Sequence, residues 1–333
     1  MKEVTIQDIA NEAKVSKSTV SRVLNGTTAV HPDKKEAVLA ASRRLGFKPN
    51  FFAQSLAKGR SMTIGVQTQL MGSPFYDTIS QGIISEMRGS GYSPIFVDGQ
   101  WTAESEEEGI QALIGRRVDG LILICGAISA ERIREICGQL PTVIVARELP
   151  AEHHNCIYVD NVDAGYRATQ HLVYFGHREI AMVQGLAHHP DAIDRLEGYK
   201  KALAENDIPF DPELIVEGTF LPESGEAAVD QLLANNKKFS AVFASNDMMA
   251  FGVRLALHKR GLRVPEDVSI VGFDDQAESA FTTPPLTTVR QPAIEMGRLA
   301  AQSVLELIDG KTFEPRAMQA QLQARESVAR IQP

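Results

Sequence analysis

The segment KSTVSRVLN at residues 17–25 has one polar and one apolar face at helical spacing. Its outer face carries hydroxyl and basic side chains, namely Lys17, Ser18, Ser21 and Arg22. Its inner face consists of Val20, Val23 and Leu24. Side chains of the first kind can reach base edges and phosphates, and the major groove of DNA admits one helix. The pattern therefore indicates DNA binding, although many short helical pairs are only packing units.

Two further helices are expected to position this segment. The first has apolar residues at helical spacing, namely Ile6, Ile9, Ala10 and Ala13. Thr5 and Asp8 have the spacing of a capping box, Lys14–Val15 makes the turn, and Ser16 caps the second helix. A third helix begins at residues 31–33 and stops at Gly46, with a packing face of Val38, Leu39, Ala41, Ser42 and Leu45. Three such helices can just close a small core.

The string D-I-A-x-x-A-x-V-S-x-x-T-V-S-R-V-L-N, from Asp8 to Asn25, resembles the helix-turn-helix of the LacI/GalR family of bacterial repressors, as in galactose-type repressors. The resemblance implies an all-α DNA-binding headpiece at residues 1–46. In it, Lys17, Ser18 and Arg22 would read bases. A second set would mostly position phosphates, which sets register without reading sequence: Thr5, Ser16, Thr19, Ser21 and Asn25. A near-palindromic operator, double-stranded and read by two heads, implies a homodimer.

Residues 47–60 are expected to connect the headpiece to the rest of the chain. The short amphipathic piece at about residues 51–57 is marginal as an isolated helix, so it could be only a linker. The family resemblance favours a hinge helix that orders on DNA. It implies that Asn50, Ala53 and Leu56 contact DNA and that Leu56 wedges a base step open in the minor groove.

After Arg60 the pattern becomes an alternation of apolar strands and helices. Strands are expected at 63–66, 93–97, 118–124, 142–145, 179–183, 215–216, 241–244, 269–272 and 286–289. Apolar strands between helices indicate parallel sheets covered on both faces. The segments VDGLIL, GHREIAMVQG, SNDMMAFGV and PPLTTVRQP match the same family, whose α/β body is two-lobed and resembles periplasmic sugar-binding proteins. The expected lobes are 61–161 with 291–322, and 162–290 with 323–333.

Open parallel sheets bind ligands outside the carboxyl ends of their strands. Sugar recognition needs hydrogen-bonding groups on several sides and a flat apolar surface. The family resemblance places an effector pocket at residues that follow strands or lie at lobe crossings: Ser73, Phe75, Tyr76, Arg147, Asp160, Asp191, Arg195, Phe220, Asn246, Asp274 and Gln291. Ala146 departs from the Asp or Asn common in the family, so one polar contact is missing.

Charge is divided unevenly along the chain, whose net charge is −8. Residues 1–60 hold eleven Lys and Arg against five Asp and Glu, whereas the remainder holds 23 against 37. A small basic head on a large acidic body is the asymmetry expected when only the head contacts DNA.

Several other chemistries are not expected. No run of about 18 apolar residues indicates a membrane span, and the start lacks an apolar signal segment, which predicts a cytoplasmic protein. Cys125, Cys137 and Cys156 lack CxxC spacing and are expected to be reduced core residues. The pairs His153–His154 and His188–His189 lack Cys or acidic partners at ligand spacing, so no metal is expected. The sequence contains neither a phosphate-binding loop nor a nucleophile elbow. We therefore predict that the protein binds no cofactor and is not an enzyme.

The sequence thus predicts a transcriptional regulator, a repressor of sugar-utilisation genes whose operator affinity is changed by a small carbohydrate. Two alternatives stay open. The same fold could use a purine or a phosphoprotein co-repressor, or the chain could be a cytoplasmic sugar-binding protein without a DNA role. No heptads follow Val328, so a tetramer built on a carboxyl-terminal coiled coil is not indicated.

Overall fold

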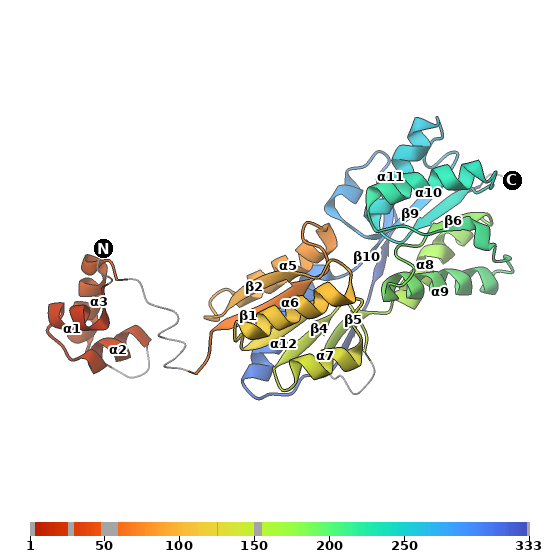
Figure 1. Cartoon of the computed structure of the whole chain (residues 1–333). Helices are drawn as coiled ribbons and strands as arrows, with labels where there is room; N and C mark the ends of the chain where they lie inside the picture. Colours follow the sequence, from red (N-terminus) through yellow and green to blue (C-terminus); the bar gives the residue numbers. More distant parts are fainter. Residues whose placement is uncertain (1–3, 26–29, 48–58, 125, 150–154, 332–333) are drawn as a thin grey trace. The chain divides into compact units, whose positions relative to one another are not determined.

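The computed structural model describes residues 4–25, 30–47, 59–124, 126–149 and 155–331 (Figure 1). The chain forms two compact units, Met1–Met62 and Thr63–Pro333, which are described separately. No helix among the described residues is long and apolar enough to span a membrane.

The first unit is a head of three short helices, α1 (Ile6–Glu12), α2 (Lys17–Asn25) and α3 (Pro32–Leu45). The capping box at Thr5 and Asp8 is confirmed, since each side chain bonds the other residue's backbone N–H. The Ser16 hydroxyl accepts the Thr19 N–H at 3.2 Å and so caps α2. Gly46 ends α3 in the left-handed conformation, which a residue without Cβ adopts at low cost.

The core of the head is smaller than the sequence pattern predicts. It consists of Ile9, Ala10, Val20, Val38 and Ala41. Two residues assigned to packing faces are not part of it: the exposed fraction is 38% for Ile6 and 37% for Leu39. Both lie at the edge of an apolar stripe, and helices this short have too few neighbours to cover its full width.

The second unit contains two six-stranded sheets. The first has the order β11-β5-β4-β3-β1-β2 and is parallel throughout. Its strands are β1 (Thr63–Thr68), β2 (Ser93–Asp98), β3 (Gly120–Ile124), β4 (Thr142–Val145), β5 (Cys156–Val159) and β11 (Arg316–Met318). Four helices pack on it: α5 (Pro74–Met87), α6 (Ala103–Gly115), α7 (Ala130–Cys137) and α12 (Ala293–Ile308). α5 packs with α12, and α6 with α7, so both faces are buried.

The second sheet repeats this plan with the order β12-β10-β9-β8-β6-β7. Its strands are β6 (Ile180–Val183), β7 (Ile215–Val216), β8 (Ala241–Ala244), β9 (Ser269–Asp274), β10 (Thr287–Arg290) and β12 (Gln321–Gln323). Only β12 is antiparallel, against β10. The helices are α8 (Asn161–Tyr174), α9 (Pro190–Glu205), α10 (Pro222–Ala234) and α11 (Asp247–Lys259), with single turns η1 (Pro212–Leu214) and η2 (Ala277–Ala280). The predicted two-lobed α/β fold with parallel sheets is therefore confirmed.

The chain crosses between the sheets three times. It leaves the first sheet after β5, returns after β10, and crosses again between Met318 and Gln321. The predicted last boundary lies after residue 322, but β12 already belongs to the second sheet from Gln321. β5 and β11 were not predicted, because strands of four and three residues give little periodicity.

Glycines allow three pairs of helices to pack backbone against backbone. The pairs are α5 with α12, α8 with α9, and α10 with α11, and each helix contributes one glycine. These are Gly82 and Gly297, Gly165 and Gly198, and Gly225 and Gly252. A Cβ on Gly198 would lie 2.1 Å from the Val162 carbonyl oxygen, closer than atoms can approach. Each lobe therefore depends on these close contacts to bring its helices over the sheet.

Gly198→Ala is expected to destabilise the protein by about 1–3 kcal/mol, because the added methyl group forces α8 and α9 apart. Urea unfolding followed by circular dichroism measures this loss. Gly115→Ala is the matched control, since nothing lies within 4 Å of a Cβ at the end of α6. The control should stay within about 1 kcal/mol of the parent, and equal losses in both variants would refute the packing argument.

Candidate functional site

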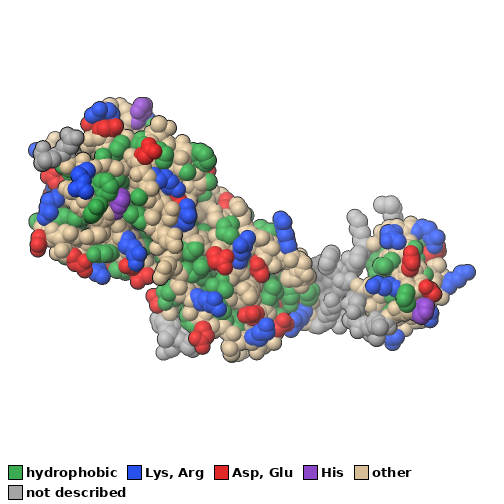
Figure 2. Space-filling view, turned by 180° about the vertical axis from the view of Figure 1, so that it is seen from behind, with side chains coloured by type: hydrophobic (Ala, Val, Ile, Leu, Met, Phe, Trp, Pro, Cys, Tyr) green, Lys and Arg blue, Asp and Glu red, His purple; other side chains and the backbone are tan. Residues whose placement is uncertain are grey.

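The polar face of α2 is accessible in the head. Lys17, Ser18 and Arg22 are exposed, whereas Thr19 and Ser21 are half-buried. Lys and Arg side chains project from several sides of the head in the space-filling view (Figure 2). Basic and hydroxyl groups on one exposed helix can enter a DNA groove, as the sequence predicts.

The hydroxyl groups at the start of α2 bond one another. The Ser16 hydroxyl lies 2.8 Å from that of Ser18 and 2.9 Å from that of Thr19. Thr5 is exposed at the start of α1. Asn25 lies at the end of α2, but its side chain is outside what the structure describes, as are the predicted hinge contacts Asn50, Ala53 and Leu56.

A pocket lies between the two lobes at the carboxyl ends of their strands. Eight predicted effector residues line it: Ser73, Phe75, Tyr76, Asp191, Arg195, Phe220, Asn246 and Asp274. Ser73, Phe75 and Tyr76 come from the start of α5 after β1, and the others come from the second lobe. The pocket therefore combines two aromatic walls with carboxylate, amide and guanidinium groups.

Arg195 is the best-connected group of this pocket, with an exposed fraction of 3%. Its Nε donates to Asn161 Oδ1 at 2.9 Å, and its Nη1 donates to the Ser245 carbonyl at 2.6 Å. Its Nη2 lies 3.3 Å from Asp191 Oδ2. The guanidinium also stacks over Phe273, 3.7 Å from the ring centroid. A planar cation held on all sides offers fixed donors and a fixed charge to the pocket.

Asn246 and Asp274 occupy the ends of β8 and β9. Asn246 caps α11 by accepting the Met249 N–H at 2.9 Å, and its amide donates to the Phe220 carbonyl at 2.9 Å. Asp274 accepts a hydrogen bond of 2.9 Å from Gln291 Nε2. Asn246 thus also has the capping role that the ends of strands commonly require.

The structure separates three predicted residues from the pocket lining. Arg147 donates to the Ile128 carbonyl at 2.5 Å, and Asp160 is exposed and caps α8. Gln291 bonds Asp274 and lines a neighbouring groove of about 800 Å³ that shares Phe75 and Asp274 with the pocket. All three residues follow the carboxyl ends of strands, which is the edge of a parallel sheet where ligands bind. Their position in the sequence therefore gives the correct edge, but it does not give the direction of their side chains.

Two lining residues were missed by sequence reasoning, Trp101 and His189. Trp101 follows β2, and a search of every strand end would have included it. His189 was weighed only as half of a histidine pair, but it precedes α9 and its Nδ1 accepts the Asp191 N–H at 3.3 Å. Its Nε2 is buried without a hydrogen-bond partner, which is uncommon and points to a polar partner outside the protein.

Burial governs the ionisation of the acids here. It raises the pKa of Asp274 to about 6, with Arg195 opposing the rise. It also raises the pKa of Asp247 to about 7; this carboxylate lies behind the pocket and accepts bonds from Ser279, Thr288 and the Gln276 N–H. Burial lowers the pKa of His189, which is therefore neutral at pH 7.

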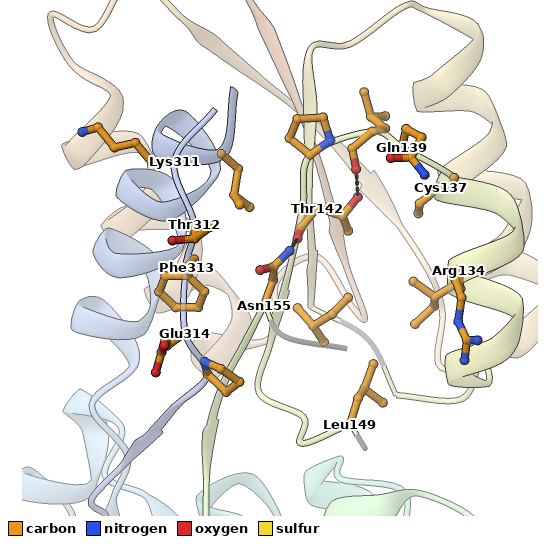
Figure 3. A pocket seen from close by; sticks show the side chains of 17 residues that line it. Arg134, Cys137, Gln139, Thr142, Leu149, Asn155, Lys311, Thr312, Phe313 and Glu314 are labelled. Carbon is orange, nitrogen blue, oxygen red and sulfur yellow. Dashed lines mark hydrogen bonds between the residues drawn. The ribbon is translucent and has the colours of Figure 1, made fainter. Parts of the chain in front are cut away.

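A larger hollow of about 820 Å³ lies elsewhere, among residues that precede β4, β5 and β11 (Figure 3). Lys311 and Arg134 stand on its opposite sides, and Leu149, Asn155 and Phe313 lie between them. No predicted site residue lines it. It opens at the amino ends of the strands, the edge where parallel sheets do not normally bind ligands.

The described residues contain no cluster of three or more His, Cys, Asp or Glu side chains that could hold a metal ion. Cys137 and Cys156 are buried thiols. Cys125, His153 and His154 lie outside the described ranges.

Asp274→Asn is expected to flatten the pH dependence of stability. The folded form keeps a proton that the unfolded chain releases above about pH 4, so Asp274 makes the parent less stable as pH rises from about 4 to about 6. The fall in unfolding free energy between pH 4 and 7 should be smaller by about 2 kcal/mol in the variant. Urea titrations across this range measure it, with the exposed Glu108→Gln as control. Parallel pH curves for parent and variant would contradict the assignment.

Comparison with known proteins places the chain in a family. Residues 5–50 match the model of bacterial regulatory proteins of the lacI family, and residues 169–328 match a periplasmic binding protein-like domain. The HTH-type transcriptional regulator AscG of Escherichia coli is 35% identical over 93% of this chain and 94% of its own.

Two solved structures are also similar. A lac repressor dimer bound to operator and the anti-inducer ONPF has a TM-score of 0.90, with 30% identity over 98% of this chain and all of that one. A complex of the transcriptional regulator CelR with cellobiose has a TM-score of 0.73, with 32% identity over the same shares. The chain belongs to the LacI family of bacterial transcriptional regulators.

Proposed function

We propose that this protein is a homodimeric transcriptional repressor whose affinity for a near-palindromic operator is changed by a small sugar. The observation that carries the proposal is the pairing of an exposed basic helix in the head with a pocket at the carboxyl ends of two facing sheets. DNA binding and small-molecule control are properties of the family; the sugar and the residues below are the proposal.

In the head, Lys17, Ser18 and Arg22 would read base edges. Thr5, Ser16, Thr19, Ser21 and Asn25 would mainly contact phosphates and fix the register of the head on the duplex. The hinge segment, residues 47–60, would order on DNA, with Asn50 and Ala53 against the minor groove and Leu56 inserted at a base step. The excess of positive charge in residues 1–60 supports this assignment, since backbone contacts dominate affinity for DNA.

A sugar fits the chemistry of the pocket. Arg195, Asp191, Asn246 and Asp274 could bond hydroxyl groups on different sides of a ring, and Phe75 and Phe220 supply flat apolar surface. CelR, which is similar throughout, was solved with cellobiose. Arg147, Asp160 and Gln291 would join the site only through movement of the lobes, because their side chains have other partners or face solvent.

The sugar would act by favouring one arrangement of the lobes. A ligand shifts an equilibrium only by the difference between its affinities for the two states. Contacts from both lobes to one ligand provide such a difference, because they all form together only when the lobes are close. The proposed effect on the hinge, and hence on the operator, follows from that change.

Selection of a preferred duplex from a random library, followed by titration with sugars, sugar phosphates and purines at fixed salt, tests the function. A palindromic site whose binding is weakened by one sugar is expected. If a purine or a phosphorylated ligand strengthens binding, the effector is a co-repressor and not an inducing sugar. If no duplex is preferred, the protein does not read DNA sequence and the proposed repressor function is wrong.

Arg22→Ala is expected to weaken binding to the selected operator about tenfold or more and to relax preference at one base position. Lys200→Ala removes the same charge from α9, where Lys200 pairs with Glu197, and should leave affinity unchanged. Fluorescence anisotropy on operator and scrambled duplexes measures both effects. An equal loss on both duplexes would reassign Arg22 to a phosphate contact.

Arg195→Lys is expected to lower effector affinity at least tenfold, because lysine keeps the charge but not the planar set of donors. Operator binding without effector should persist if the fold is intact, which circular dichroism verifies. Arg178→Lys is the matched control, since Arg178 is exposed and bonds only backbone carbonyls at Asn206 and Asp207. If Arg195→Lys binds the effector as tightly as the parent does, Arg195 does not contact the effector.

A further inference from the structure

The space between the lobes is small for the proposed ligand. The pocket lined by Arg195 and Asp274 has room of about 20 Å³, which accommodates about one water molecule. A sugar ring with its hydroxyl groups cannot enter a space of that size. A lining side chain or a whole lobe must therefore move before a ligand of this class can bind.

Trp101 contacts lining side chains of both lobes. It lies in the turn between β2 and α6, in the first lobe, yet it packs against an apolar cluster formed entirely by the second lobe. Its ring centroid lies 5.9 Å from that of Phe220. Its indole N–H donates to the Tyr76 hydroxyl at 3.3 Å. The indole therefore bridges the cleft where the two aromatic walls face each other.

Phe220, its neighbour, is held firmly. A Cβ on Gly185 would lie 2.6 Å from the Phe220 ring, so the ring rests directly on that backbone. His189 packs edge-on against the same ring at 5.4 Å, and the Phe220 carbonyl accepts the Asn246 amide. None of these contacts leaves room for the Phe220 ring to turn.

Trp101 is held less firmly. Its side chain is only partly buried and has one long hydrogen bond. Its backbone is left-handed, with φ of 54°, directly after Gln100 with φ of 50°. Non-glycine residues adopt this conformation only where surrounding contacts hold them there. The backbone of the turn is anchored to Asp98 and Thr68, so the side chain is the part free to move.

We propose that Trp101 is a displaceable plug that determines how large a sugar the site accepts. This inference rests on the proposed function, since it assigns a role within the same effector site. Displacing the indole opens space beside Phe220 and exposes the unpartnered His189 Nε2 to a ligand hydroxyl. The distance that the indole can retreat sets the upper limit of ligand size.

Fluorescence gives the first test, because Trp101 is the only tryptophan in the chain. A sugar that binds the parent, shown by calorimetry, should shift the emission maximum or change its intensity. The matched control carries Trp101→Phe and Tyr174→Trp, which moves the fluorophore to an exposed position at the end of α8. The fluorescence emission of this control should not change when the sugar binds. Binding of a sugar with no change in Trp101 emission would overturn the proposal.

Ligand size gives the second test. Parent, Trp101→Phe and Trp101→Ala are titrated with ribose, glucose and cellobiose, after circular dichroism has verified folding. The alanine variant should accept cellobiose at least tenfold more tightly than the parent does, with phenylalanine intermediate. If the largest sugar that binds is the same for all three proteins, Trp101 does not limit ligand size and the proposal is wrong, although the sugar site itself is still supported.

Free indole separates failure of the plug from failure of the proposed function. If none of the proteins binds any sugar, the sugar function fails, but the plug can still be tested. Trp101→Ala should then bind indole and gain thermal stability, whereas the parent should not, because a ligand that binds only the folded state stabilises it. An alanine variant that ignores indole would overturn the plug as well.

Discussion

The buried guanidinium of Arg195 is the interaction on which the ligand-facing end of the second lobe depends. A charge out of water is costly unless every donor is satisfied. Its partners come from the start of α8, from the end of β8 and from α9 itself, and Phe273 of β9 lies beneath it. Satisfying one cation thus fixes four elements relative to one another. The surrounding carboxylates then face the cleft with only one positive charge between them, so the site suits neutral, hydroxyl-rich ligands.

Close helix packing provides the rigid frame around that cation. α8 and α9 meet at Gly165 and Gly198, directly beside the turn that holds Arg195: a Cβ on Gly165 would lie 2.6 Å from the Arg195 carbonyl oxygen. The same glycine contact recurs in α5–α12 and α10–α11. Side chains at the carboxyl ends of the strands therefore stand on elements that cannot slide. Movement is left to the three crossings between sheets and to the loops that face the cleft.

Sequence reasoning reached the architecture because its signals are local. Capping residues, apolar strands and glycine stops each act within a few positions, and the string from Asp8 to Asn25 fixed the head. The strand rule pointed to the edge of the sheets where the pocket lies. It could not give side-chain direction, and so Arg147 and Asp160 were grouped with residues that do line the pocket, whereas Trp101 was left out. Those outcomes depend on tertiary contacts across the cleft.

Strained backbone gathers at that same edge. Trp101, Ala146, Phe220, Asp274 and Asp275 all have positive φ, and each lies at the end of a strand or within a few residues after it. Ala146 has no side-chain polar group to favour the left-handed region, which Asn and Asp tolerate better. Such conformations persist only where neighbouring contacts enforce them. For Trp101 the contact with Phe220 joins the two lobes, whereas Asp275 is held within the second lobe by Arg290 and Arg325. A ligand that displaces the Trp101 side chain would therefore replace a contact between the lobes, whereas the strain at Asp275 would stay within one lobe.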